Sequence, residues 1–162
     1  MEQDQVLAHF RETDALLEGH FELSSGLHSN TYLQCALALQ FPTDAESFGR
    51  AIAERLVETR DDWSPVKVDT VASPAIGGLV IGYAVANALN KRFIWTERQQ
   101  GTMTLRRGFT LRAGERIVVV EDVITTGGST RECIAALEAN GGQVVGAASI
   151  IDRSNGRADV GV

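Results

Sequence analysis

Two neighbouring carboxylates, Glu121 and Asp122, follow an apolar run and precede a loop rich in hydroxyl groups and glycine. The apolar run, residues 116–120, is mostly β-branched without alternation, which is typical of a strand buried on both faces. Ligands of open α/β sheets bind where such strands end. The loop, residues 125–130, leads into a predicted helix, so its backbone N–H groups can form a nest for an anion. Carboxylates for hydroxyl groups beside a nest for phosphate predict a sugar-phosphate site.

The glycines and hydroxyls of this loop have a simpler interpretation when they are taken alone. Gly127, Gly128 and Ser129 would suit an ordinary strand-to-helix turn with a Ser or Thr cap. The loop lacks the lysine of a GxxxxGK[ST] motif and the spacing of GxGxxG. The full run of residues 118–130 is far more specific, and it closely resembles the phosphoribosyl pyrophosphate (PRPP) motif of the type I phosphoribosyltransferases.

Four further segments resemble one branch of that family, the orotate phosphoribosyltransferases. Residues 21–34 resemble their N-terminal hood, and residues 73–78 occupy the position of their pyrophosphate loop. Residues 97–109 resemble the mobile catalytic loop with its flanks, and residues 152–153 resemble the site of an orotate-contacting arginine. The resemblance therefore covers nearly the whole chain, in the same order.

This resemblance implies a fold and a domain organisation. The fold would be the α/β type I phosphoribosyltransferase fold, with a central, mostly parallel sheet flanked by helices and a small N-terminal hood. We expect a single domain over residues 1–162, with the hood inside residues 1–40. We also expect the complete sequence to continue somewhat past Val162.

The resemblance also implies a reaction and its requirements. PRPP and orotate would give orotidine 5′-monophosphate and pyrophosphate, a step of de novo pyrimidine synthesis. Mg²⁺ would be the cofactor, held through the pyrophosphate of PRPP and not by direct protein ligands. The enzyme would be a homodimer in which the mobile loop reaches the neighbouring subunit's site. Nucleic acid and membranes are not expected as partners.

Site residues follow from the same resemblance, position by position. Glu121 and Asp122 would hold the ribose hydroxyls and stabilise an oxocarbenium-like transition state, and Arg98 would reach the leaving pyrophosphate, so these three would be catalytic. The residues implied to bind PRPP are Ser73, Pro74, Arg98, Glu121, Asp122, Val123, Ile124, Thr125, Thr126, Gly127, Gly128, Ser129 and Thr130. The residues implied to bind orotate are Tyr32, Leu33, Thr125 and Arg153.

Some of these residues have alternative interpretations. The planar guanidinium of Arg153 suits a carboxylate or a ring carbonyl, but an arginine after a strand can also lie on the surface. Tyr32 and Leu33 could line the base pocket or belong to the core. Arg106 and Arg107 are interpreted as hairpin or interface residues, because neighbouring strand positions point to opposite faces.

The chain departs from many orotate phosphoribosyltransferases in its lysines, since only two of its 15 basic residues are lysine. Ser24 and Gly77 stand where the hood and the pyrophosphate loop of those enzymes often carry lysine. The mobile loop is short, and two glutamines follow Arg98 with no lysine or histidine in the loop. Either Arg98, alone or with Arg106 or Arg107, performs the loop's task, or the enzyme is slow, or the site has drifted.

Hydrophobic patterning predicts the elements that must position these residues. Apolar residues at four-residue spacing, such as Phe48, Ile52 and Leu56, predict helices, and β-branched runs predict strands. Strands that alternate with helices imply a parallel sheet wrapped by helices. We expect strands at residues 68–72, 93–95, 116–120 and 144–151, helices at 43–59, 79–89 and 129–140, an N-terminal helix around 6–10, a hairpin near 103–109, and two short strands near 21–23 and 32–35.

Composition limits the class of protein. A chain of 162 residues with 44% hydrophobic content suits one folded domain and argues against disorder. No apolar run approaches the roughly 20 residues of a membrane-spanning helix. Cys35 and Cys133 are too isolated to predict a zinc site or a disulfide framework. A soluble cytoplasmic domain is therefore expected.

Charge is unevenly distributed along the chain. The net charge of −6 argues against nucleic-acid binding by charge alone, but residues 91–116 carry seven basic and two acidic side chains, a local charge of +5. Two alternatives stand beside the orotate enzyme. One is a purine phosphoribosyltransferase on the same fold, which the hood and Arg153 disfavour. The other is a non-catalytic PRPP sensor that binds RNA through residues 91–116, with an affinity that falls steeply with salt.

Overall fold

The structure, a computed structural model, describes residues 1–22, 28–59 and 67–162. These residues fall into two units, Met1–Ala45 and Glu46–Val162. None of the described helices combines the length and the hydropathy that crossing a membrane requires.

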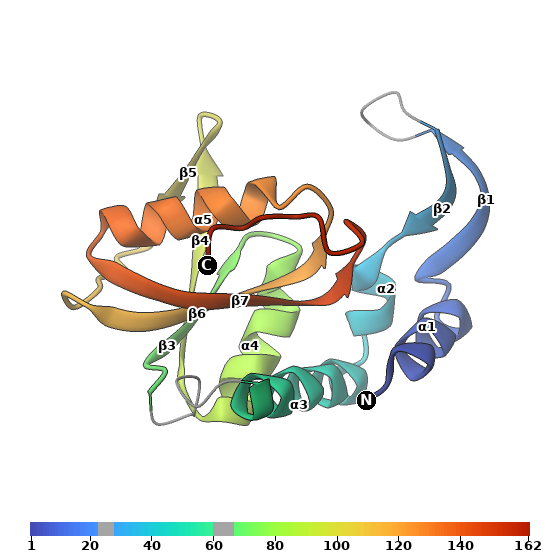
Figure 1. The fold of residues 1–162 in the computed structure, drawn as a ribbon, viewed down its shortest axis with the longest axis horizontal. Coiled ribbons are helices and arrows are strands. Elements are labelled where there is room, and N and C mark those ends of the chain that lie inside the picture. The colour runs from blue at the N-terminus through green and yellow to red at the C-terminus, as the bar shows by residue number, and fades with distance from the viewer. Residues whose placement is uncertain (23–27, 60–66) are drawn as a thin grey trace. The chain divides into compact units, whose positions relative to one another are not determined.

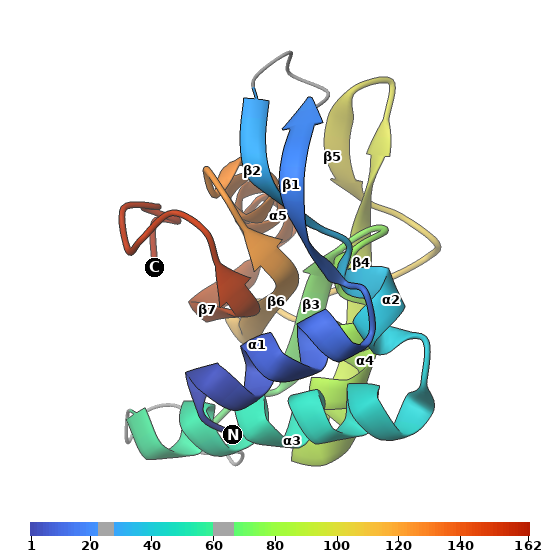
Figure 2. The same ribbon diagram turned by 90° about the vertical axis from the view of Figure 1, so that its right-hand side faces the viewer.

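The first unit contains a two-stranded antiparallel hairpin (Figure 2). Its elements are α1 (Gln3–Glu12), β1 (Leu16–Glu22), β2 (His28–Leu33) and α2 (Cys35–Leu39). Helix α1 is capped by Gln5, whose side-chain oxygen accepts a hydrogen bond of 2.9 Å from the backbone N–H of Glu2. The predicted N-terminal helix and strand pair are confirmed, but β1 begins earlier than predicted, at Leu16, and Cys35 begins a helix where a strand end was predicted.

The second unit begins within α3 and contains the main sheet. Its elements are α3 (Pro42–Thr59), β3 (Thr70–Pro74), α4 (Gly78–Leu89), β4 (Arg92–Gln99), β5 (Thr102–Leu105), β6 (Glu115–Ile124), α5 (Gly128–Ala139) and β7 (Gly142–Asp152). The predicted strands and helices of this unit are confirmed with small shifts of their ends. The main differences are that β4 and β6 each continue four residues beyond their predicted ends, so Glu121 and Asp122 belong to β6 itself. The hairpin predicted near 103–109 is instead formed by β4 and β5.

Four parallel strands and one antiparallel edge strand form the sheet, in the order β5-β4-β3-β6-β7 (Figure 1). The chain passes from β3 through α4 to β4 on one side, and from β6 through α5 to β7 on the other. The strand order therefore reverses between β3 and β6. Ligands of open α/β sheets bind in the crevice at the carboxyl ends of two such strands.

Both faces of the central strands are buried, which explains their unbroken apolar sequence. Val118, Val119 and Val120 have no exposed surface. On one face, Val119 packs in a cluster with Ile134 and Leu137 of α5, while α4 covers the opposite face of the sheet (Figure 1). Full burial of a valine side chain contributes about 1.5–3 kcal/mol. A well-packed core therefore holds the acidic pair at the edge of the sheet.

Candidate active site

A cavity of about 340 Å³ lies at the point where the strand order reverses. Residues 74–77, from the end of β3, form one wall, and residues 121–130, from the end of β6 to the start of α5, form the other. Eleven of the 13 residues predicted to bind PRPP line this cavity, the exceptions among the described residues being Ser73 and Arg98. Ala75, Ile76 and Gly77 also line it; they belong to the predicted pyrophosphate-loop segment, residues 73–78, of which only Ser73 and Pro74 are predicted to bind PRPP.

The two carboxyl groups have different environments. Glu121 is only 7% exposed, and burial, reinforced by the hydrogen bond to Asp122 and by its charge, raises the pKa of Glu121 to about 8. Asp122 is less buried, and one of its carboxylate oxygens accepts a hydrogen bond of 2.8 Å from the backbone N–H of Val123. At neutral pH the site therefore offers a protonated Glu121, which can donate a hydrogen bond, beside the acceptor oxygens of Asp122.

Two glycines at the start of α4, Gly77 before the helix and Gly78 as its first residue, make room for these carboxyl groups. A Cβ on Gly77 would lie 2.9 Å from each oxygen of Asp122. A Cβ on Gly78 would lie 2.9 Å from the carbonyl oxygen of Val120 and 3.2 Å from Oε1 of Glu121. Distances this short require the neighbouring atoms to move. The glycines therefore serve close approach of the two cavity walls, and the peptide bond between Ala75 and Ile76 in the same wall is cis.

The second wall is a loop that leads into α5. Gly127 precedes the helix with a φ of 74°, a conformation that favours glycine. The guanidinium of Arg131 donates a hydrogen bond of 3.0 Å to the carbonyl oxygen of Thr126, which fixes the loop against the helix. The first turn of a helix presents unpaired N–H groups and the positive end of the helix dipole. With Ser129 and Thr130 among the lining residues, this wall suits a phosphate.

Arg98 lies on β4 and outside the cavity lining. Its guanidinium forms an ion pair of 2.6 Å with Glu132 of α5 and donates a hydrogen bond of 2.9 Å to the carbonyl oxygen of Gly101. The segment predicted to be the mobile loop with its flanks, residues 97–109, includes the end of β4, the turn and β5. Arg106 and Arg107 follow β5, and both pair with Glu97, at 3.5 and 2.8 Å.

Ser73, which precedes one cavity wall in sequence, and Arg153, which follows β7, do not line the cavity. The buried hydroxyl oxygen of Ser73 has no hydrogen-bond partner among the described residues, and a Cβ on Gly82 of α4 would overlap it. Arg153 follows β7, where its backbone N–H donates a hydrogen bond of 2.8 Å to the carbonyl oxygen of Ile124. This bond ties the start of the C-terminal segment to the end of β6.

Tyr32 and Leu33, the hood residues predicted to bind orotate, are the last two residues of β2 in the first unit. Tyr32 is 40% exposed, and its ring packs against Phe21 with a centroid distance of 5.7 Å. The interpretation of Tyr32 as a core residue is therefore not supported, while Leu33 is half-buried. Ser24, the hood position compared above with lysine, lies outside the described residues.

The fold and the site together define a phosphoribosyl transferase. Residues 43–160 match the sequence model of the family described as "Phosphoribosyl transferase domain". An orotate phosphoribosyltransferase of Pelotomaculum thermopropionicum is 49% identical over all 162 residues of this chain and 82% of its own length. One of Heliobacterium modesticaldum is 52% identical over the same shares of both chains.

A solved structure agrees with these relatives. The crystal structure of orotate phosphoribosyltransferase from Aeropyrum pernix matches with a TM-score of 0.73 and 27% identity, over 94% of this chain and 83% of that chain. The chain belongs to the orotate phosphoribosyltransferase family. The family resemblance and the fold class predicted from the sequence are thereby confirmed.

Proposed function

We propose that this protein transfers the phosphoribosyl group of PRPP to orotate and releases pyrophosphate, which gives orotidine 5′-monophosphate. The bond from ribose C1′ to the pyrophosphate oxygen breaks, and a bond from C1′ to a ring nitrogen of orotate forms. The observation that carries this proposal is the placement of an acidic pair beside a phosphate nest in one cavity. The chain's match to orotate phosphoribosyltransferases along its whole length supports it.

The cavity walls suggest how PRPP is held. The loop at residues 126–130 takes the 5′-phosphate through backbone N–H and hydroxyl donors. Protonated Glu121 donates to one ribose hydroxyl, while Asp122 accepts from the other. As pyrophosphate departs, positive charge develops on the ribose ring, and the nearby Asp122 carboxylate stabilises it where burial weakens the screening by water.

Mg²⁺ is the proposed cofactor, and it would neutralise charge on the departing pyrophosphate. The described residues contain no group of three or more His, Cys, Asp or Glu side chains that could hold a metal ion. Mg²⁺ commonly binds through few carboxylates, substrate phosphates and water. We therefore propose that the pyrophosphate of PRPP holds the ion, in the cavity that residues 74–77 and Asp122 help to line.

Four residues are proposed to bind orotate. Thr125 lines the cavity, and Arg153 has a planar guanidinium that suits a carboxylate or a ring carbonyl. Tyr32 and Leu33 would contribute backbone groups and apolar cover. These four roles are proposals that rest on the family's pattern.

The functional form is proposed to be a homodimer in which Arg98 acts across the interface. Val80 and Tyr83 of α4, three residues apart, are 47% and 64% exposed. A row of large apolar side chains at helical spacing suits burial by another molecule. Since Arg98 lies outside the cavity lining of its own chain, a second subunit is the proposed site of its action.

A cytoplasmic location completes the proposal. Cys35 and Cys133, the two cysteines of the chain, are both buried thiols, as is usual in a reducing compartment.

Substrate choice is tested by offering the bases one at a time. With PRPP and Mg²⁺, the protein should consume orotate and leave adenine, guanine and hypoxanthine unchanged. Turnover of a purine base alone would indicate the purine enzyme. PRPP binding without turnover of any base would indicate a sensor, and either result would overturn the proposal.

A further inference from the structure

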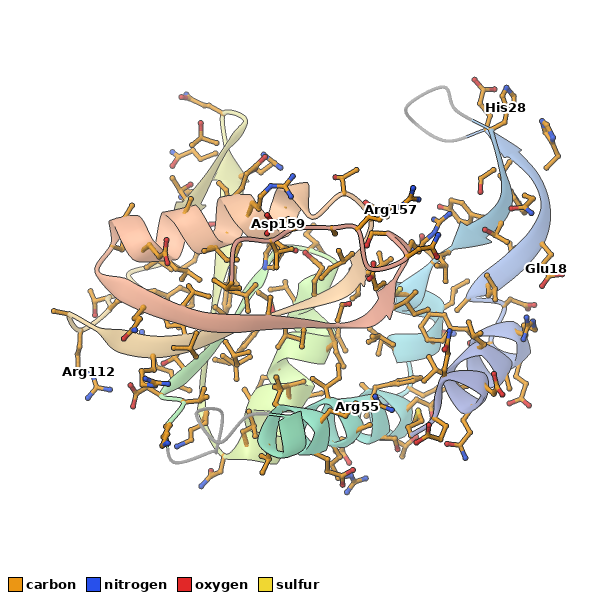
Figure 3. All side chains as sticks on the ribbon, viewed as in Figure 1. Glu18, His28, Arg55, Arg112, Arg157 and Asp159 are labelled. Atoms are coloured by element: carbon orange, nitrogen blue, oxygen red, sulfur yellow. The ribbon has the colours of Figure 1, made fainter. Side chains whose placement is uncertain are left out.

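His20 and His28 face each other across the hairpin of the first unit. Nε2 of His20 lies 2.9 Å from Nδ1 of His28, and the ring centroids are 4.8 Å apart with a 42° angle between the ring planes. Both residues are exposed, and His28 opens β2 at the outer end of the hairpin (Figure 3). Neither side chain has a role in the proposed reaction.

The pairing of the two hairpin strands brings His20 and His28 together. Strands β1 and β2 are antiparallel, with Glu22 opposite His28 and Phe21 opposite Ser29. His20 is two residues before Glu22, so both side chains lie on the strand face that also carries His28. The pairing register shifts between Glu18 and Phe21. Because Glu22 is the residue directly opposite His28, His20 reaches His28 diagonally across the strand pair.

Nε2 of His20 and Nδ1 of His28 can share one hydrogen bond or bind one metal ion together. In the hydrogen bond, one neutral imidazole donates and the other accepts. If the donating ring moves its proton to its other nitrogen, both facing nitrogens present lone pairs and no net charge is lost. Neutral imidazole is a preferred ligand of Cu²⁺, Ni²⁺ and Zn²⁺.

We propose that His20 and His28 form a chelating site for a transition-metal dication, Cu²⁺ or Ni²⁺. Two nitrogens 2.9 Å apart, each about 2.0–2.1 Å from a shared ion, subtend an angle of roughly 90° at that ion. A right angle belongs to tetragonal or octahedral coordination, which Cu²⁺ and Ni²⁺ adopt, and tetrahedral Zn²⁺ requires a wider angle.

Water completes the coordination of this ion. Across the described ranges, no group of three or more His, Cys, Asp or Glu side chains could hold a metal ion, so His20 and His28 are the two protein ligands proposed among the described residues. The bound ion would join β1 to β2 near the outer end of the hairpin. This proposal does not depend on the proposed function.

The test uses the full-length protein without an affinity tag, titrated with Cu²⁺ and with Ni²⁺ and followed by calorimetry. One ion per chain is expected. The variants His20→Gln and His28→Gln should each weaken binding at least tenfold. Because chelation needs both ligands, the double variant should bind no more than about twofold more weakly than either single one.

The third histidine provides the matched control. His9 lies 3.2 Å from Asp44 in the same unit, and His9→Gln should leave the affinity unchanged. The electron paramagnetic resonance spectrum of the Cu²⁺ complex should show two nitrogen ligands in the wild type. Wild-type affinity in both His20→Gln and His28→Gln, or equal weakening in His9→Gln, would overturn the proposal, and circular dichroism confirms that each variant is folded.

Discussion

Gly77 stands so close to Asp122 that a Cβ on the glycine would lie 2.9 Å from both carboxylate oxygens. The two residues come from different walls of the cavity, one after β3 and the other within β6. The absence of a side chain at position 77 therefore decides where the Asp122 carboxylate can point. This proximity also gives a physical reason for glycine, and not lysine, at this position, because any side chain there would meet the Asp122 carboxylate.

The first prediction concerns this clearance. Gly77→Ala should lower kcat/KM for PRPP by about 10²-fold, because a catalytic group displaced by a fraction of an ångström loses its alignment. The measurement is steady-state kinetics, with the melting temperature as a check on folding. In the double variant Gly77→Ala, Asp122→Asn, the alanine should cost little beyond the cost of the asparagine. Fully additive losses would contradict a shared mechanism.

The second prediction concerns pH and stability. The pKa of Glu121 is raised from 4.5 to about 8 in the folded protein, so between those values the native state keeps a proton that the unfolded state has lost. The free energy of unfolding should therefore fall as pH rises through this window, by up to about 1.4 kcal/mol per pH unit from this group. Below pH 4.5 the contribution is fully present, and above pH 8 it is lost.

The variant Glu121→Gln has no titrating proton at this position, so its pH dependence of stability can be compared with that of the wild type. Denaturant unfolding at several pH values between 5 and 9 should give a shallower pH dependence in the variant than in the wild type. The variant should also gain stability relative to the wild type toward pH 9. Parallel stability curves for the two proteins would show that Glu121 titrates normally.

The third prediction separates the proposed contact of Arg98 with departing pyrophosphate from its ion pair with Glu132. Arg98→Ala should lower kcat more than KM, because the proposed contact forms with departing charge. Glu132→Gln removes the partner that holds Arg98 at 2.6 Å and should keep kcat at or above the wild-type value. Both side chains are about half exposed, so neither variant should unfold the protein. An unchanged kcat in Arg98→Ala would remove Arg98 from the reaction.

The fourth prediction concerns the interface. Val80→Asp places a charge in the exposed apolar row and should convert the proposed dimer to monomer in sedimentation velocity. Val57→Asp on α3 is the matched control, since Val57 is also an exposed aliphatic residue, at 41%, and it should leave the dimer intact. A dimer that withstands Val80→Asp would place the interface elsewhere.

Mixed dimers test whether Arg98 acts on the neighbouring subunit. Arg98→Ala and Asp122→Asn should each be nearly inactive, and unfolding and refolding them together should restore roughly a quarter of the sites, because half of the random dimers pair one intact wall with one intact arginine. No restoration would show that both residues serve the same chain's site.

The sequence predicts the second unit well because its signals are local. The run ending at Val120 is apolar on both strand faces, and the helices carry periodic patterns, so strand and helix order follow without tertiary information. Glu121 and Asp122 could be identified as site residues for the same reason. The resemblance of residues 118–130 to one motif then predicts most of the second cavity wall.

Other features depend on contacts between distant segments, which a local pattern does not encode. Gly77 matters only because β3 and β6 are neighbours in the sheet. Strand β1 starts at Leu16 because it pairs with Leu33, and its own sequence shows little alternation there. The pairing of Arg98 with Glu132 is an exposed ion pair between β4 and α5. Each requires the fold before it can be predicted.

Asp122→Asn tests the central claim most directly when both the consumption of orotate and the release of pyrophosphate are measured. With PRPP and Mg²⁺, the wild-type protein should consume orotate and release pyrophosphate in equal amounts, as measured by orotate absorbance and a coupled pyrophosphate assay. The variant should stay folded and react about 10²–10³-fold more slowly or worse, because it loses the carboxylate that stabilises developing charge. Orotate that is not consumed by the wild type at any enzyme concentration, or an Asp122→Asn variant as fast as the wild type, would contradict the account.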